Sequence, residues 1–168
     1  RALAAIEHQS LTSEILPMDI NGASVKDDEQ PGKAKIERIP TLRPAFKSDG
    51  TITAANASSI SDGASAVVLT RESNLIGRTP LARILAHATH SIHPSEFTLA
   101  PIGAIQKLLE KTGWSADSVD LFEINEAFAM VTMLTMQALN LPHVNVNIYG
   151  GACAQGHPIG STGRRLIV

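Results

Sequence analysis

From residue 64 onward the chain alternates short apolar runs with helical patterns, and this alternation is what most constrains the fold. Two segments, APIGAIQKLLEKTG (100–113) and EAFAMVTMLTMQALN (126–140), have the residue spacing of helices. Apolar runs typical of strands surround them, at 64–70, 80–91, 118–125 and 144–151. Strands that alternate with helices pack as a sheet covered by helices. The sequence therefore predicts an α/β fold.

The two helical patterns differ in how much of their surface is apolar. Pro101 opens the first helix and Gly113 ends it, and its apolar residues lie on one face: Ile102, Ile105, Leu108 and Leu109. The second pattern is apolar nearly all round, which predicts a buried helix. A last helix is expected to begin near Ser161.

The first third of the chain is poorer in regular patterns. Residues 1–20 predict a short amphipathic helix followed by an extended piece, and residues 21–40 predict an exposed loop. Residues 42–63 are rich in loop formers, with a tight turn at Asp49-Gly50. The chain opens within a helical pattern that has no capping residue before it, and it closes on a helix start that has no stop signal after it, so we expect it to be part of a longer protein.

Composition narrows the class of protein. Apolar residues make up 43% of the 168 residues, enough for a packed core, and the net charge is −2. A charge near zero and few aromatic residues argue against a nucleic-acid partner. One cysteine forms no internal disulfide, which favours a reducing, cytoplasmic location. No apolar run approaches the roughly 20 residues of a membrane span, so no membrane partner is expected.

Polar residues stand where the apolar run 118–125 ends. Asn125 and Glu126 lie directly between this run and the following helix. In open α/β sheets ligands bind beyond the carboxyl ends of strands, which makes both residues candidates for a functional site. The alternative is that Asn125 or a neighbour merely caps the helix.

A glycine-rich stretch, GGACAQGHPIGSTG (150–163), follows the last strand-like run. It has neither the Lys-Ser/Thr of a phosphate-binding P-loop nor the GxGxxG spacing of a dinucleotide site. His157, held by a proline before a helix, is suited to act as a general base, although a histidine in a turn is often structural. Cys153 is either its nucleophile or an inert packing residue.

Two further features have plainer interpretations. His87, His90 and His93 have a spacing that would bring them together only on a helix, whereas their segment is expected to be extended. No metal site is therefore predicted. The charged residues of 26–38 predict a solvated surface.

Three segments together resemble one protein family. INEAFA (124–129), GGACAQGHPIGSTGRR (150–165) and LRPAFKSDGTITAANASSISDGASAVV (42–68) are similar to motifs of the thiolases, the acetyl-CoA acetyltransferases. They occur in the family's order along nearly the whole chain. The occurrence of NEAFA together with GGxxAxGHPxGxxG is specific to the family, whereas neither motif alone would identify it.

The resemblance implies a fold and a reaction. Thiolases have a five-layered αβαβα fold made of two similar halves and a loop domain. Residues 1–40 would be the end of the loop domain, and 41–168 the layered αβα second half without its last strands. The family transfers acyl groups between coenzyme A thioesters, making or cleaving 3-ketoacyl-CoA. Coenzyme A is a co-substrate, no cofactor is implied, and the enzymes are homodimers or homotetramers.

The resemblance also implies roles for single residues. His157 matches the histidine that activates the nucleophilic cysteine and helps bind the thioester oxygen. Asn125 matches the asparagine that holds a water in that oxyanion site. Ser58 matches the serine that hydrogen-bonds the pantetheine arm. Three residues match the lining of the pantetheine and acyl tunnel: Ala54, Ala127 and Phe128.

The chain also departs from the family pattern. Ala55 and Ser59 stand where glycines are usual, and Ser61 stands where asparagine is usual. The family's nucleophilic cysteine belongs to the first half and its acid–base cysteine to a CxGGG motif, and neither lies within these residues. We therefore expect this 168-residue stretch to be inactive alone, and Cys153 to be a packing residue.

Two other classes of function compete with the thiolase hypothesis. A non-catalytic acyl-CoA binding module would use Ser58 and the glycine-rich turns without chemistry. A serine hydrolase is disfavoured because the GxSxG elbow is missing.

Overall fold

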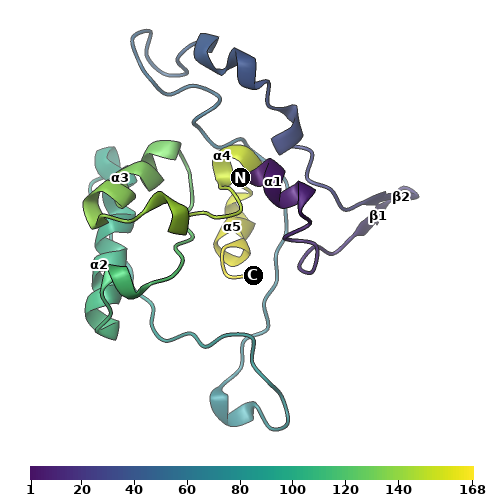
Figure 1. Cartoon of the computed structure of the whole chain (residues 1–168), viewed down its shortest axis with the longest axis vertical. Helices are drawn as coiled ribbons and strands as arrows, with labels where there is room; N and C mark the ends of the chain where they lie inside the picture. Colours follow the sequence, from purple (N-terminus) through teal and green to yellow (C-terminus); the bar gives the residue numbers. More distant parts are fainter.

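The computed structural model describes all of residues 1–168 and places the helices in two groups. Helices α2 (Ala100–Thr112) and α3 (Ala129–Leu139) pack side by side. Helices α4 (Ala152–Gln155) and α5 (Ile159–Arg165) lie next to this pair, with α1 (Ala2–Glu7) beside α4 (Figure 1). The first and last thirds of the chain therefore meet at one place.

Helix α2 matches its prediction closely. Pro101 lies in its first turn, and Gly113 ends it in the left-handed region with φ of 71°. The predicted apolar face is half-buried, whereas Gln106, Lys107 and Glu110 are exposed. Local signals for the start, the face and the end agree, which explains why this helix could be read from sequence.

Helix α3 is shorter and less buried than its apolar composition predicted. It begins at Ala129, and Asn140 ends it with φ of 52°. Thr132 and Thr135 are buried, but 38% of Met130 and 61% of Met133 is exposed. The prediction of a helix buried all round is therefore wrong, because only one of its faces is covered in this structure.

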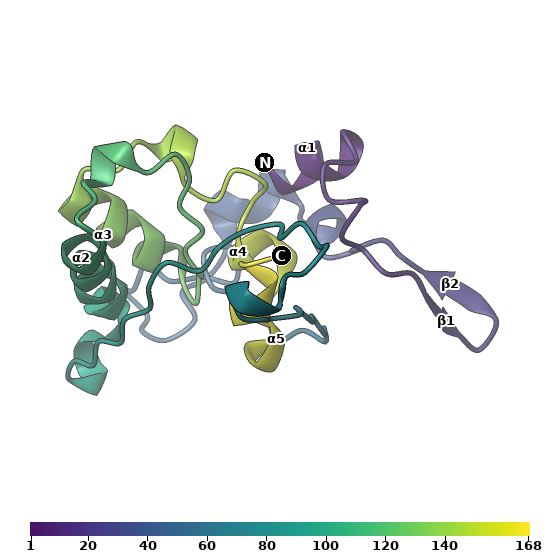
Figure 2. The same cartoon turned by 90° about the horizontal axis from the view of Figure 1, so that it is seen from below.

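A small β-hairpin lies in the region predicted to be extended and then loop. Strands β1 (Met18–Ile20) and β2 (Ala23–Val25) pair antiparallel, with Met18 opposite Val25. Asn21 and Gly22 form the turn with φ of 54° and 82°, the signature of a two-residue hairpin loop. The hairpin projects away from the helices, and all six of its strand residues are exposed (Figure 2).

The apolar runs 64–70 and 80–91 are not strands in the structure. Neither run takes part in a backbone–backbone hydrogen bond, and 98% of Val68 is exposed. A strand requires a neighbour that accepts and donates ladder hydrogen bonds, and none lies beside these runs. Their composition indicated a preference for extended backbone, but pairing depends on residues distant in the sequence.

The runs 118–125 and 144–151 meet in a single parallel bridge. Phe122 N–H donates to Asn145 O at 2.8 Å, and Asn147 N–H donates to Phe122 O at 2.9 Å. Regular strands were predicted here, and only this bridge forms. The main apolar core surrounds it and consists of Phe122, Ile124, Leu141 and Val146.

Short 3₁₀-helices connect the larger elements. The predicted tight turn is present, since Gly50 N–H donates to Lys47 O at 3.0 Å. The six 3₁₀-helices are Pro31–Lys33, Ile36–Thr41, Glu72–Asn74, Pro94–Leu99, Ala116–Ser118 and His143–Asn145.

Candidate functional site

Asn125 lies where the extended chain turns toward helix α3, but it does not cap that helix. The N-cap position is Phe128, and no side chain bonds to the first turn. The capping interpretation of Asn125 is therefore wrong. Its Oδ1 atom is buried without a hydrogen-bond partner, while its Nδ2 atom points to His157. A buried amide oxygen that no protein group satisfies is typical of a site that takes a ligand or water.

The glycine-rich stretch forms two short helices joined by a bend. Helix α4 ends at Gly156, whose φ of 84° is readily adopted only by glycine. Helix α5 begins at Ile159, two residues before the predicted start. A side chain at Gly156 would overlap the Ser61 hydroxyl, so the bend lies directly against the 59–61 segment.

His157 occupies the bend between α4 and α5 and is held from several sides. Its backbone N–H donates to Ser59 O at 3.1 Å. Its Nδ1 atom lies 2.8 Å from Thr162 Oγ1, and its Nε2 atom lies 3.5 Å from Asn125 Nδ2. The structure thus brings together Asn125 and His157, the two residues expected to be catalytic.

Glu126 connects the Asn125 turn to the glycine-rich stretch. Its carboxylate accepts a hydrogen bond from Cys153 N–H at 3.1 Å and one from Asn147 Nδ2 at 3.0 Å. The carboxylate fills the space beside Gly151, where any side chain would overlap it. Gly151 therefore gives the carboxylate room for its two hydrogen bonds, through which Glu126 fixes the turn against α4.

Asn147 supports the same turn from the other side. Its Oδ1 atom accepts from Ile124 N–H at 2.7 Å, and its Nδ2 atom donates to Ile124 O at 2.9 Å. Only 4% of Asn147 is exposed. Its side chain thus continues the pairing that begins at Phe122, and it holds the residue immediately before Asn125.

The residues expected to bind the pantetheine arm lie on adjoining segments. Ser58 N–H and Oγ both donate to Ala127 O, at 3.1 and 3.0 Å. Ala57 forms an isolated antiparallel bridge with Phe128. Ala54 is exposed in the turn in which Asn56 N–H bonds to Thr53 O. Ser58, Ala127 and Phe128 are therefore neighbours, while their expected roles stay predictions.

Aromatic contacts fix Phe128 at this junction. Its ring centroid lies 6.0 Å from that of Phe46 and 6.1 Å from that of Phe97. Both are tilted or edge-on contacts of the kind that stabilise aromatic clusters. Phe128 therefore links the 42–63 region to the 3₁₀-helix Pro94–Leu99 that precedes α2.

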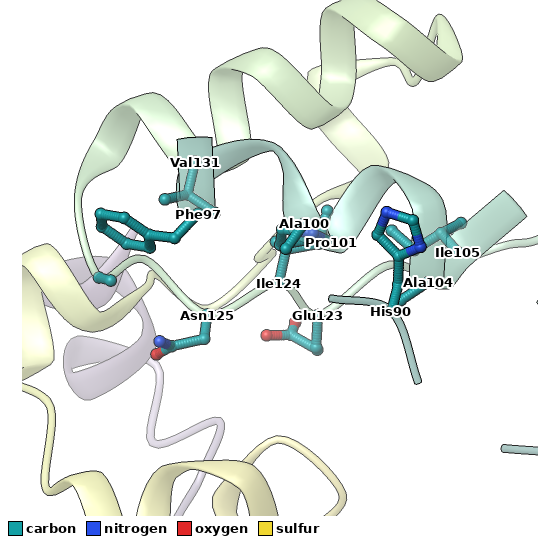
Figure 3. Close-up of a pocket in the computed structure, with 11 residues that line it drawn as sticks. His90, Phe97, Ala100, Pro101, Ala104, Ile105, Glu123, Ile124, Asn125 and Val131 are labelled. Carbon is teal, nitrogen blue, oxygen red and sulfur yellow. The ribbon is translucent and has the colours of Figure 1, made fainter. Parts of the chain in front are cut away.

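A largely apolar cavity of about 420 Å³ lies beside Asn125. Asn125 and Glu123 project from one extended segment to the same side of it, while Phe97 and Val131 line another part (Figure 3). Burial raises the pKa of Glu123, a nearby Glu126 charge adds to that effect, and Ile148 N–H and Arg165 oppose it. The wall of the cavity next to Asn125 is thus apolar with one partly desolvated carboxyl group.

Cys153 is not paired with His157 by any hydrogen bond. Its thiol donates to Glu126 O at 3.8 Å. Burial, and then the charge and hydrogen bonding of Glu126, raise the pKa of Cys153 to about 12. A thiol with a raised pKa is a poor nucleophile near neutral pH, so these observations favour Cys153 as a packing residue over a reactive Cys153–His157 dyad.

The three histidines of the 87–93 segment have separate surroundings. His87 O accepts from Lys111 Nζ, His90 packs against Gly103, and His93 Nδ1 lies 2.7 Å from Ser95 Oγ. No group of three His, Cys, Asp or Glu side chains is arranged to hold a metal ion.

Two residues of the site were not predicted, Asn147 and Thr162. The Asn147 side chain bonds to the Ile124 backbone, and the Thr162 side chain lies against the His157 ring. Contacts of this kind leave no periodic pattern in the sequence. The one available signal was position, since Thr162 follows His157 by little more than one helical turn.

Comparison with known families gives two matches. The family model described as thiolase, N-terminal domain, matches residues 1–73, and that described as thiolase, C-terminal domain, matches residues 78–168. No helix has both the length and the apolar character needed to cross a membrane.

Known relatives and solved structures agree with these matches. A probable acetyl-CoA acetyltransferase of Dictyostelium discoideum is 45% identical over 100% of this chain and 42% of its own length. The Bacillus anthracis acetyl-CoA acetyltransferase structure is 39% identical with a TM-score of 0.92, covering 99% of this chain and 44% of that one. Human mitochondrial 3-ketoacyl-CoA thiolase in complex with CoA is 36% identical with a TM-score of 0.94, covering 99% and 43%.

The chain spans less than half the length of these proteins. Over that span the agreement in structure confirms the predicted thiolase-like α/β fold. The two family models together match nearly every residue of the chain, and they do so in the family's order. The chain belongs to the thiolase family.

Proposed function

We propose that the protein containing this chain transfers acyl groups between coenzyme A thioesters, by thiolytic cleavage or Claisen condensation of 3-ketoacyl-CoA. The observation that carries the proposal is the 3.5 Å approach of the Asn125 amide to the His157 imidazole. Relatives named acetyl-CoA acetyltransferases, and a related thiolase structure that contains CoA, support it.

The chemistry requires a base and an oxyanion site, and this pair is suited to both. Nε2 of His157 takes the proton of a cysteine thiol, leaving a thiolate and an imidazolium. The thiolate forms a C–S bond with the acyl carbonyl carbon, and the carbonyl electron pair moves to oxygen. The imidazolium Nε2–H and a water held by the Asn125 amide donate to that oxygen, each lowering the barrier by a few kcal/mol. When the electron pair returns, the bond to the leaving group breaks: a thioester releases CoA thiolate and a 3-ketoacyl-CoA releases the acetyl-CoA carbanion, and either one takes up the imidazolium proton.

The buried Oδ1 atom of Asn125 supports the assignment of the water. This atom accepts no hydrogen bond from the protein. A water that donates to Oδ1 keeps its second hydrogen for the substrate oxygen, which is the role expected of Asn125.

The pantetheine arm is assigned to the segment that joins Ser58 to Ala127 and Phe128. Ser58 Oγ donates to Ala127 O, so its remaining lone pairs are free to accept from an amide N–H of the arm. Ala54 and Ala127 have small side chains that leave room for a narrow chain, and Phe128 offers an apolar wall.

The nucleophile is assigned to a cysteine outside these 168 residues. Cys153 is the only cysteine of the chain, and its raised pKa keeps it protonated. The stretch 1–168 expressed by itself is therefore expected to show no thiolysis. The same observation favours the second candidate function, a binding module without chemistry, for this stretch alone.

Several broader properties belong to the same proposal. Acyl-CoA is the substrate, coenzyme A the co-substrate, and no cofactor takes part. The intact protein is a homodimer or homotetramer, and a related peroxisomal thiolase is named as dimeric. Its location is the cytoplasm, in line with a relative named a cytosolic enzyme. The loop domain ends near residue 40.

The test is CoA-dependent cleavage of acetoacetyl-CoA by the protein expressed from its complete coding sequence. The wild type is expected to turn over, and His157→Ala to lose nearly all turnover. His143→Ala is the matched control, because His143 is exposed and forms hydrogen bonds only through its backbone carbonyl. Binding of acetoacetyl-CoA without cleavage by the wild type would favour the binding module instead.

A further inference from the structure

His157 lies between two polar side chains, one at each ring nitrogen. Thr162 Oγ1 is 2.8 Å from Nδ1, and Asn125 Nδ2 is 3.5 Å from Nε2. Thr162 is only 2% exposed, so no bulk water competes for its hydroxyl group. These two neighbours therefore determine which ring nitrogen of His157 carries the proton.

The direction of the Thr162 hydrogen bonds follows from a third atom. Thr162 Oγ1 is also 3.1 Å from Pro158 O, one helical turn earlier, and a carbonyl oxygen only accepts. In the arrangement in which the hydroxyl gives its one hydrogen to Pro158 O, which also accepts from Ser161 N–H and Thr162 N–H, it accepts from His157, and the proton lies on Nδ1. The Asn125 amide points its NH₂ group at Nε2, which fits a ring whose Nε2 atom carries the lone pair.

We propose that Thr162 is a positioning residue that holds neutral His157 in the Nδ1–H tautomer, so that Nε2 carries the lone pair. Thr162 acts through the imidazole and makes no contact with the reacting atoms. Two elements fix it: the first turns of α5, and the Pro158 carbonyl that begins this helix.

The consequence for catalysis rests on the proposed function. A base must present a lone pair to the thiol, and only Nε2 faces the Asn125 side of the site. When Nε2 takes the thiol proton, Nδ1–H keeps its acceptor in Thr162 and Nε2–H is ready to donate to the substrate oxygen. In the opposite tautomer, Nε2 would carry a proton already and could not serve as the base.

The test compares Thr162→Val, which removes the hydroxyl at nearly constant shape, with Thr162→Ser, which keeps it. Thr135→Val is the matched control, because Thr135 is fully buried and makes the same back-bond, to Val131 O at 2.8 Å, with no histidine beside it. All are made in the protein expressed from its complete coding sequence, with ¹⁵N-labelled histidine. His157→Gln identifies the His157 signals.

Long-range ¹H–¹⁵N correlation spectra report the tautomer whether or not the protein is an enzyme. The wild type, Thr162→Ser and Thr135→Val are expected to show the Nδ1–H pattern for His157, and Thr162→Val a mixture with Nε2–H. In the acetoacetyl-CoA assay kcat should fall about tenfold in Thr162→Val with KM unchanged, and Thr162→Ser should restore it.

Wild-type His157 in the Nε2–H form would overturn the proposal, and this holds even if Thr162→Val fails to fold. So would a Thr162→Val spectrum that keeps the wild-type pattern, or a Thr162→Ser enzyme as slow as the valine variant. A wild type that shows the expected tautomer but no thiolysis would contradict the proposed function alone.

Discussion

The side-chain amide of Asn147 pairs with both backbone polar groups of Ile124, at 2.7 and 2.9 Å. Asn147 adopts φ of 48°, a left-handed conformation that asparagine tolerates better than most residues. Its backbone therefore turns away while its side chain replaces the next rung of the bridge. The position of Asn125, the residue after Ile124, depends on this contact.

Asn147→Ala is expected to destabilise the fold. The change leaves Ile124 N–H and C=O buried without partners and removes a donor to Glu126, at a cost of about 2–4 kcal/mol. Urea unfolding followed by circular dichroism measures this cost. Asn145→Ala is the control, since no side-chain bond involves Asn145. Equal midpoints for the two variants would contradict the bracing role of Asn147.

Gly151→Ala is expected to lower stability by about 1–3 kcal/mol, because a methyl group there overlaps the Glu126 carboxylate. Gly160→Ala, within α5, meets nothing within 4 Å and should be neutral or stabilising. Thermal unfolding of the two variants separates them. A Gly151→Ala protein as stable as the wild type would show that Glu126 is not held against α4.

The Cys153 thiol is expected to resist alkylation by iodoacetamide at pH 7–9 in the folded protein. After unfolding in urea it should react readily, and mass spectrometry measures the extent of labelling in both states. The cause is its pKa of about 12, raised mainly by burial. Cys153→Ala should keep most of the thiolysis activity. Rapid labelling in the folded state, or an inactive alanine variant, would restore the dyad with His157.

The same pKa predicts how Cys153 affects stability with pH. Folding favours the protonated thiol, because the folded pKa lies above the unfolded value of about 8.5. This contribution is complete below about pH 8.5 and is lost as pH rises toward 12. Unfolding midpoints of the wild type and Cys153→Ala should therefore converge or cross in alkaline buffer rather than in acid.

Local patterns predicted the parts of the fold that local interactions determine. Helix α2 has its opening proline, one apolar face and its closing glycine within 14 consecutive residues. The runs 64–70 and 80–91 have strand-like composition, but pairing requires residues far away in the sequence, and it does not occur. The hairpin was not predicted because Asn21-Gly22 begins a polar stretch rich in turn formers, which indicated a loop.

The site divides in the same way. Asn125 and His157 could be named because each stands beside a change of local pattern, and the family resemblance joined them. Asn147 and Thr162 could not be named, because their roles arise only when the chain brings them to Ile124 and to the His157 ring. The residues that support the candidate site are thus harder to predict than those that carry its chemistry.

The most direct measurement of the central claim is a double-mutant cycle on Asn125 and His157. Asn125→Ala, His157→Ala and the double variant are compared by kcat/KM for acetoacetyl-CoA cleavage in the protein made from its complete coding sequence. Residues that act as one unit are non-additive, so the double variant should lose little more than His157→Ala alone. Losses that multiply, or turnover unchanged in His157→Ala, would contradict the account.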